Sequence, residues 1–300
     1  MKKKIKIFVA ALISILFIVY DCTKKEKETI LKGSTAVLVD ESLKPIIEDQ
    51  IAVFENSYDA KIKVISQSEN ESILSLSKGV ADILVLPRKF TSEEEKLFTQ
   101  RKIYPRSTLF AKDAIALIRS KKSNDTLVSI DEMVAFLKGT SSKIKGLVFD
   151  NPNSSSVNYI TKLAGLKNLP EKGVFSFKTN KEVINYVAEN DGMIGVVGIN
   201  WIYQPTLDMM DTVNNITVMG VKGVNSNEFV LPTQENIALG KYPLARDLYI
   251  VYCQGYEGLG MGFSSFISGE KGQRIILKSG LVPVRIPGRN IRTRNQLETK

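Results

Sequence analysis

The chain of 300 residues is long enough for two domains, and its 43% hydrophobic and 24% charged residues are ordinary for a globular protein. It has no histidine, and its two cysteines are far apart in the sequence, which excludes histidine-based catalysis, a CxxC redox pair and most zinc sites. Of the net charge of +9, residues 1–21 carry +3 and residues 285–300 carry +4, so the body carries only +2 and lacks the basic stripe of a nucleic-acid-binding protein.

The N-terminus has the pattern of an export signal. Four lysines precede an apolar run over residues 7–20, which is shorter than the roughly 20 residues that a membrane-spanning helix needs. We predict that residues 1–21 are a signal peptide, that Cys22 is lipidated and that residues 22–29 are a polar tether. Asp21 stands where a small residue usually precedes such a cysteine, so an uncleaved signal anchor is the alternative. Either arrangement places the body in the cell envelope, anchored on the periplasmic side of a membrane.

The body begins with alternating strand and helix signals. Residues 35–39 form a short apolar run that suits a buried strand. The apolar residues of 43–54 fall on one helical face, with Ser42 placed as the N-cap and Pro45 in the first turn. Residues 61–65 alternate between apolar and polar, as a half-buried strand does.

The same alternation continues to the end of the chain. Apolar runs predict strands at residues 82–86, 114–118, 147–149, 193–197 and 249–252. Helical periodicity and capping signals predict helices at residues 73–76, 130–137, 154–163, 181–188 and 263–279, and a further helix that opens at residues 91–95. Strands that alternate with helices predict an α/β fold with largely parallel sheets, in which ligands bind beyond the carboxyl ends of the strands.

Several segments, taken in their order along the chain, resemble the phosphate-binding proteins of ABC importers. Residues 229–236 and 242–249 are similar to that family's Pro-Thr-x-Glu and Tyr-Pro-Ile-x-Arg-x-Leu-Tyr stretches. Further likenesses to the family lie at residues 81–94, 192–197 and 266–283. Residues 150–156 resemble a Bacteroidota lipoprotein branch of the family, and the whole resemblance covers most of residues 33–287.

The resemblance implies a type II periplasmic-binding-protein fold, in which two α/β lobes close on a ligand like a Venus flytrap. The first lobe would combine residues 30–112 with residues 244–300, and the second would be residues 113–243. The implied function is that of a monomeric solute-binding lipoprotein that delivers phosphate or a related oxyanion to an ABC permease complex in the inner membrane. No catalytic constellation is visible, and we expect no enzyme activity, cofactor or metal.

The resemblance also implies ligand-binding residues. In the family the anion is held by hydroxyls and backbone N–H groups at helix N-termini, where the helix dipole is positive, and by an arginine. The hydroxyls that match these positions, or lie between them, are those of Ser42, Ser68, Ser154, Ser155 and Ser156. Asp150 stands in place of the family's arginine, and Arg88, which follows the strand at 82–86, is the cation expected to replace it.

Carboxylates lie beside these hydroxyls, mostly where the family has small residues. They belong to Asp40, Glu41, Glu69, Glu71 and Asp150. A carboxylate about 4 Å from a phosphate charge costs roughly 4 kcal/mol at an effective dielectric near 20. Asp40 and Asp150 are therefore candidate ligand-reading groups, unless these acids point away from the cleft and cap helices. Two alternatives to phosphate transport stay open: a solute that carries an amine or is a cation, and a surface lipoprotein without a transport role.

Overall fold

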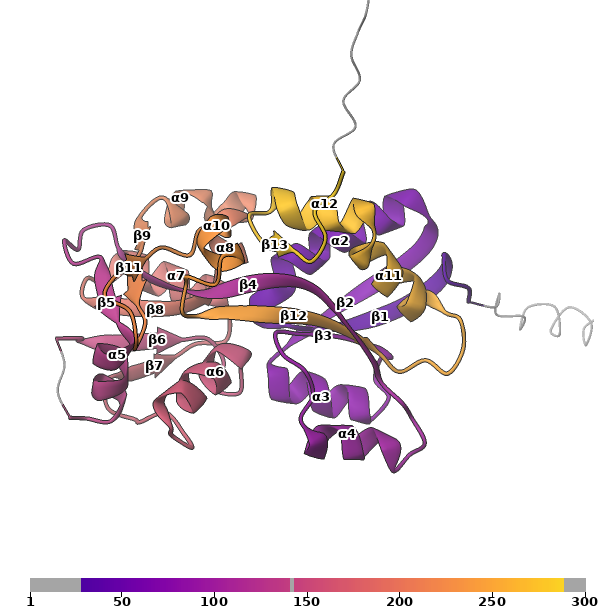
Figure 1. Ribbon diagram of the computed structural model, residues 1–300, viewed down its shortest axis with the longest axis horizontal. Coiled ribbons are helices and arrows are strands. Elements are labelled where there is room, and N and C mark those ends of the chain that lie inside the picture. The colour runs from indigo at the N-terminus through magenta and orange to yellow at the C-terminus, as the bar shows by residue number, and fades with distance from the viewer. Residues whose placement is uncertain (1–27, 141–142, 289–300) are drawn as a thin grey trace, which may run out of the picture.

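The computed structural model describes residues 28–140 and 143–288 of the chain (Figure 1). The predicted signal peptide of residues 1–21, Cys22 and most of the tether lie outside these residues. Within the described part, no helix is both long and apolar enough to cross a membrane. The described residues form two lobes joined by long strands (Figure 1).

The sheet of the first lobe lies on the right in Figure 1. β1 (Lys32–Asp40) runs parallel to β2 (Asp59–Gln67) on one side and to β3 (Ile83–Leu86) on the other. β12 (Ala245–Tyr252) comes from near the end of the chain and pairs with β3 in the antiparallel sense. Both ends of the described chain therefore contribute to the first lobe.

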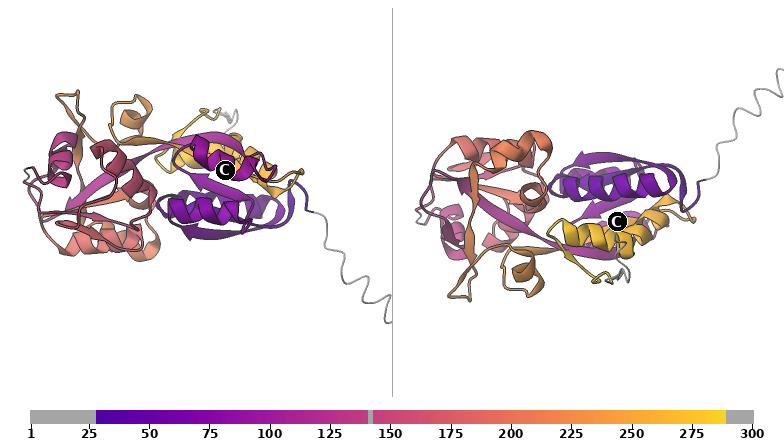
Figure 2. Two further views of the ribbon diagram at one scale, coloured as in Figure 1. Left: turned by 90° about the horizontal axis from the view of Figure 1, so that it is seen from below. Right: turned by 90° about the horizontal axis from the view of Figure 1, so that it is seen from above.

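Helices cover both faces of this sheet (Figure 2). They are α2 (Lys44–Ser57), α11 (Leu259–Ser268) and α12 (Glu270–Lys278) on one face, and α3 (Glu69–Ser77) and α4 (Ser92–Thr99) on the other. Val37 and Val39 of β1 pack in the core beneath α2, whereas Leu38 packs in a second core with side chains of α3 and α4. Because successive side chains of a strand point to opposite faces, a strand covered on both faces must be apolar throughout.

The second lobe has its own sheet, in the order β4-β8-β6-β7, with β9 paired to β4. Its strands are β4 (Arg106–Ser120), β6 (Gly146–Phe149), β7 (Val174–Ser176), β8 (Met193–Gly198) and β9 (Ile216–Val218), and a small separate sheet holds β5 (Leu127–Ser129), β10 (Gly220–Lys222) and β11 (Phe229–Val230). Its helices are α5 (Ile130–Leu137), α6 (Ser155–Ala164), α7 (Asn180–Glu189), α8 (Asn200–Tyr203), η2 (Leu207–Met209), α9 (Met210–Val213) and α10 (Gln234–Ala238). β6 is parallel to both β7 and β8, as alternating strands and helices predict.

Two long strands connect the lobes (Figure 1). β4 pairs with β12 over residues 106–114 and with β8 over residues 115–118, so one strand belongs to both sheets. These pairings, and that of the short β13 (Val282–Pro283) with β4, are antiparallel. The α/β fold class is confirmed, with parallel strands inside each lobe and antiparallel strands where the chain crosses. The division of the chain at residues 113 and 243 stays a prediction, and β4 changes partner beside the first of these positions.

The sequence predicted one continuous C-terminal helix over residues 263–279. This prediction is wrong, because the chain forms two helices there, α11 and α12. Gly269 lies between them in an extended conformation and ends one helix as it begins the next. α12 then folds back so closely that a Cβ at Gly272 would lie 2.5 Å from the Cα of Ile267. Helical periodicity continues across such a break, so it could not reveal the change of direction.

The predicted N-cap at Ser42 is also wrong. A short 3-10 turn, η1 (Glu41–Leu43), precedes α2, and the Asp40 side chain caps this turn by accepting the Ser42 N–H. The N-cap position of α2 itself is Leu43, which makes no side-chain capping bond, and Pro45 lies in the first turn as predicted. Ser42 is therefore free to point its hydroxyl toward the second lobe.

Candidate functional site

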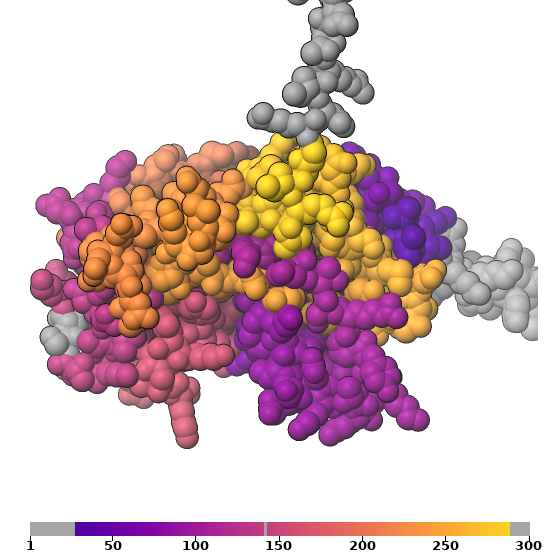
Figure 3. Space-filling view, in the orientation of Figure 1, coloured from indigo at the N-terminus to yellow at the C-terminus, as the bar shows by residue number. Residues whose placement is uncertain are grey.

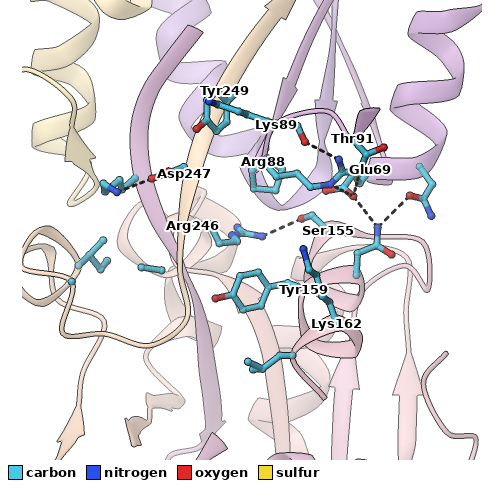
Figure 4. A pocket seen from close by; sticks show the side chains of 18 residues that line it. Glu69, Arg88, Lys89, Thr91, Ser155, Tyr159, Lys162, Arg246, Asp247 and Tyr249 are labelled. Carbon is cyan, nitrogen blue, oxygen red and sulfur yellow. Dashed lines mark hydrogen bonds and ion pairs between the residues drawn. The ribbon is translucent and has the colours of Figure 1, made fainter. Parts of the chain in front are cut away.

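A cleft of about 1090 Å³ lies between the lobes. The space-filling view shows it as a notch on the side of α3 and α4 (Figure 3). Arg246 and Tyr249 of β12 form its base, Arg88 lies on the wall of the first lobe, and Ser155 and Tyr159 of α6 lie on the wall of the second (Figure 4). Segments distant in sequence therefore meet in this cleft, beyond the ends of β1, β3 and β6.

The Asp40 carboxylate joins the two lobes at the inner end of the cleft. Its Oδ1 accepts hydrogen bonds from the Ser42 N–H at 3.2 Å, from the Ser42 hydroxyl and from the Ser155 hydroxyl at 2.8 Å. Its Oδ2 accepts the Ser155 N–H at 3.4 Å. Asp40 is fully buried because β1 ends there and α6 begins directly opposite. The dipole of α6 favours negative charge at this position.

Arg246 is the buried cation of the site. Its guanidinium binds the Asp113 carboxylate of β4 through two hydrogen bonds of 3.0 and 2.6 Å. The same guanidinium donates to the Ser155 hydroxyl at 3.1 Å and to the Ser42 hydroxyl at 3.3 Å. Planar guanidinium groups suit such paired contacts with carboxylates and other oxyanions. Arg246 therefore lies directly behind the hydroxyls that surround Asp40.

A second polar cluster lies behind the first and also spans the lobes. The side-chain amide of Asn180, at the start of α7, donates to the carboxylates of Glu41 and, at 3.1 Å, of Asp150. The Asn180 N–H also donates to Glu41, at 3.1 Å. Burial raises the pKa of Glu41 to about 7, and burial raises the pKa of Asp150 well above its ordinary value. The Ser154 hydroxyl donates to Asp150, so this predicted site residue points away from Asp40.

Arg88 lies on the wall of the cleft, in a network of its own. Its guanidinium forms salt bridges of 2.9 Å with Glu69 and 2.8 Å with Glu94. Glu69 also accepts a hydrogen bond of 2.9 Å from the Asn158 side chain of α6, which adds another contact between the lobes. Two carboxylates therefore offset the charge of Arg88, and Arg246 is the arginine that reaches the central hydroxyls.

The remaining predicted hydroxyls take different positions. Ser68 caps α3, and its N–H and hydroxyl both donate to Glu71 of the same helix. The Ser156 hydroxyl is buried and has no hydrogen-bond partner among the described residues. Of the eight predicted ligand-binding residues, the structure brings Asp40, Ser42 and Ser155 into direct contact.

Arg246 and Asp113 were not predicted as site residues from the sequence. A signal was present, because each is a charged residue close to an apolar run of its strand: residues 114–118 follow Asp113, and residues 248–252 follow Arg246. Such residues need partners when buried, and a strand in the core of a sheet is covered on both faces. In the described part of the chain, no group of three or more acidic, cysteine or histidine side chains is placed to hold a metal ion.

The fold and this cleft define a binding protein of two lobes with polar groups from both lobes facing each other. The chain belongs to the PBP superfamily, since the model of the PBP superfamily domain matches residues 25–271. The family resemblance predicted from the sequence is thereby confirmed, while the Bacteroidota branch stays a prediction.

Known relatives and structures agree with this assignment. The chain is 24% identical over 293 residues to the phosphate-binding protein PstS of Borreliella burgdorferi, covering 89% of this chain and 95% of the relative. A substrate-binding protein from Clostridium perfringens, assigned to phosphate ABC transport and solved with bound phosphate, superposes with a TM-score of 0.70 at 20% identity, over 84% of this chain and 100% of that one. An ABC-type phosphate transport receptor from Vibrio cholerae superposes with a TM-score of 0.63 at 17% identity, also over 84% of this chain and 100% of that one. At these identities the structural likeness establishes the fold.

Proposed function

We propose that this chain is the extracytoplasmic solute-binding protein of an ABC importer and that its ligand is phosphate or a related oxyanion. It would work as a monomer on the periplasmic side of a membrane, anchored through Cys22, and deliver its ligand to an ABC permease in the inner membrane. It would bind without catalysing a reaction and without a cofactor. Membership of the PBP superfamily and the phosphate-binding relative support this function.

One observation carries the proposal: donors from both lobes converge on a buried arginine. The Ser42 hydroxyl from the first lobe and the N–H and hydroxyl of Ser155 from the second lie around the Arg246 guanidinium. Hydroxyls and backbone N–H groups at a helix start, with an arginine behind them, suit an oxyanion. We take Ser42, Ser155 and Arg246 as the central binding groups, with Ser68, Ser154, Ser156, Arg88, Asp40 and Asp150 around them.

The architecture also supports a closing motion. β4 and β12 are the long connections between the lobes, and polar contacts cross the cleft at its inner end. Hinge closure of two lobes around a ligand needs few connecting residues and a polar interface that can separate. A ligand bound between the lobes would therefore hold α6 and the start of α2 together.

The test is isothermal titration calorimetry of the chain from residue 23 onward, which retains every described residue. We expect heat of binding with phosphate and not with neutral amino acids. Ser155→Ala should weaken phosphate binding by about tenfold or more, because a hydrogen bond to a charged group contributes about 1.5–3 kcal/mol. Ser265→Ala, an exposed serine on α11, is the matched control and should bind as the wild type does. Absence of phosphate and sulfate binding at millimolar concentration, both in the wild type and in a variant without the Asp40 carboxylate, would show that the oxyanion proposal is wrong.

A second candidate ligand is a solute that carries an amine. It is favoured by three buried carboxylates, those of Asp40, Glu41 and Asp150, which form no salt bridge with a cation of the described residues. The same calorimetry distinguishes the candidates if lysine, a diamine and Ca²⁺ are included. Heat with an amine alone, lost in Asp150→Asn, would replace the phosphate proposal.

A further inference from the structure

The Asp40 carboxylate lies where the proposed oxyanion would be bound. It accepts the N–H and hydroxyl of Ser42 and the N–H and hydroxyl of Ser155, and these four donors are the uncharged groups proposed to hold the ligand. Its two oxygens take these contacts at the N-terminal end of α6, a helix of ten residues. A carboxylate is itself an oxyanion, and it presents the same kind of acceptor that a phosphate group would present.

The donors come from different lobes, and the Asp40 carboxylate between them is buried. Asp40 and Ser42 belong to the first lobe and Ser155 to the second, and Asp40 and Ser42 are fully buried. Arg246 donates to both serine hydroxyls from behind. In a flytrap protein, a ligand draws the lobes together by contacting groups on each of them. Here a side chain of the protein makes these contacts.

A further anion does not fit beside this carboxylate. The buried carboxyl groups of Glu41, Glu69, Asp113 and Asp150 also lie around this cluster, and Arg246 is already paired with Asp113. A second anion placed beside the Asp40 carboxylate would be repelled strongly where water is excluded. An incoming oxyanion must therefore displace the Asp40 carboxylate from its four donors.

We propose that Asp40 is an internal anion of this protein: it fills the oxyanion site, closes the lobes without a ligand and lowers the affinity for external phosphate. This inference rests on the proposed function. It makes Asp40 a specificity-determining residue, because only a ligand that competes for the same donors better than a tethered carboxylate can open and occupy the site.

The first test is phosphate titration of Asp40→Ser, which removes the carboxylate and keeps a small polar side chain. We expect phosphate to bind at least tenfold more tightly than to the wild type, and Asp40→Asn to give a smaller gain. Asp211→Ser, an exposed position on α9, removes the same charge far from the cleft and should leave the affinity unchanged. Equal or weaker phosphate binding in both Asp40 variants, with melting temperatures showing that they are folded, would overturn the proposal.

The second test is small-angle X-ray scattering without ligand. The Asp40→Ser protein should have a larger radius of gyration than the wild type and should contract on addition of phosphate, whereas the wild type should change little. If neither protein binds phosphate, the proposed function is wrong. If the wild type binds phosphate, and the Asp40 variants bind it no more tightly and scatter identically without it, the function stands and the role of Asp40 is refuted.

Discussion

At the scale of single residues, the unusual feature of this protein is the concentration of buried carboxyl groups where the lobes meet. Asp113 has a cationic partner in Arg246, and Glu69 has one in Arg88. Glu41 is buried and instead accepts hydrogen bonds from the backbone N–H and the side-chain amide of Asn180. A buried carboxyl group without a cation is more stable when it keeps its proton.

We therefore predict that Glu41 makes the stability of the protein depend on pH. The unfolded chain releases this proton near pH 4.5, whereas burial in the folded protein holds the pKa at about 7. The unfolded state then binds fewer protons between these values, so the free energy of unfolding falls as pH rises through this window, by about 3 kcal/mol. Glu41→Gln, which resembles the protonated acid, should remove this loss.

Urea denaturation at pH 5 and pH 8 measures the effect. The wild type should lose about 3 kcal/mol more than Glu41→Gln between the two pH values. Burial also raises the pKa of Asp150, and the Glu41 charge adds to that shift, so Glu41→Gln should reduce the Asp150 contribution to the pH dependence as well. Parallel pH profiles for the two proteins would contradict the protonated state of Glu41.

At the scale of elements, the pair α11 and α12 depends on close backbone contact. A Cβ at Gly272 would lie 2.4 Å from the Phe266 carbonyl oxygen and 2.5 Å from the Ile267 Cα, and neither backbone atom can move aside without shifting α11. We predict that Gly272→Ala destabilises the protein by about 1–3 kcal/mol, the range for overpacking a well-packed core. Thermal unfolding of the variant and the wild type would measure this loss of stability.

A matched control for this change is Gly255→Ala. Gly255 has no neighbour within 4 Å of an added Cβ, and its backbone does not adopt a positive φ. This variant should therefore be as stable as the wild type or slightly more stable. An equal loss of stability in both variants would show that the contact between α11 and α12 is not the cause.

At the scale of the whole molecule, the two lobes differ in how they would be anchored. β1 begins at the outer end of the first lobe, away from the second lobe (Figure 1). An anchor on the preceding tether would hold the first lobe and leave the second free to move about the crossing strands. We predict that mass spectrometry of the membrane-extracted protein will show a chain that begins at Cys22 and carries a lipid mass. An intact N-terminus at Met1 would favour an uncleaved signal anchor.

The sequence was sufficient to predict the α/β fold class and the family. Both depend on local information: the period of apolar residues, the capping residues and the order of short motifs along the chain. The break at Gly269 and the cap at Asp40 were not predicted, because a change of direction and the choice of capping side chain depend on packing against distant segments. Their local patterns were compatible with the simpler helices expected.

The sequence alone also supplied some of the polar residues that the site uses, namely Asp40, Ser42 and Ser155, but not Arg246 and Asp113. Only the tertiary structure decided which of them meet. Asp40 and Ser155 are 115 positions apart, and Arg246 and Asp113 are 133 apart. Whether a carboxylate repels a ligand, caps a helix or takes the place of the ligand depends on the donors that surround it. Those donors come together only when two lobes, each built from its own sheet, close on the same point.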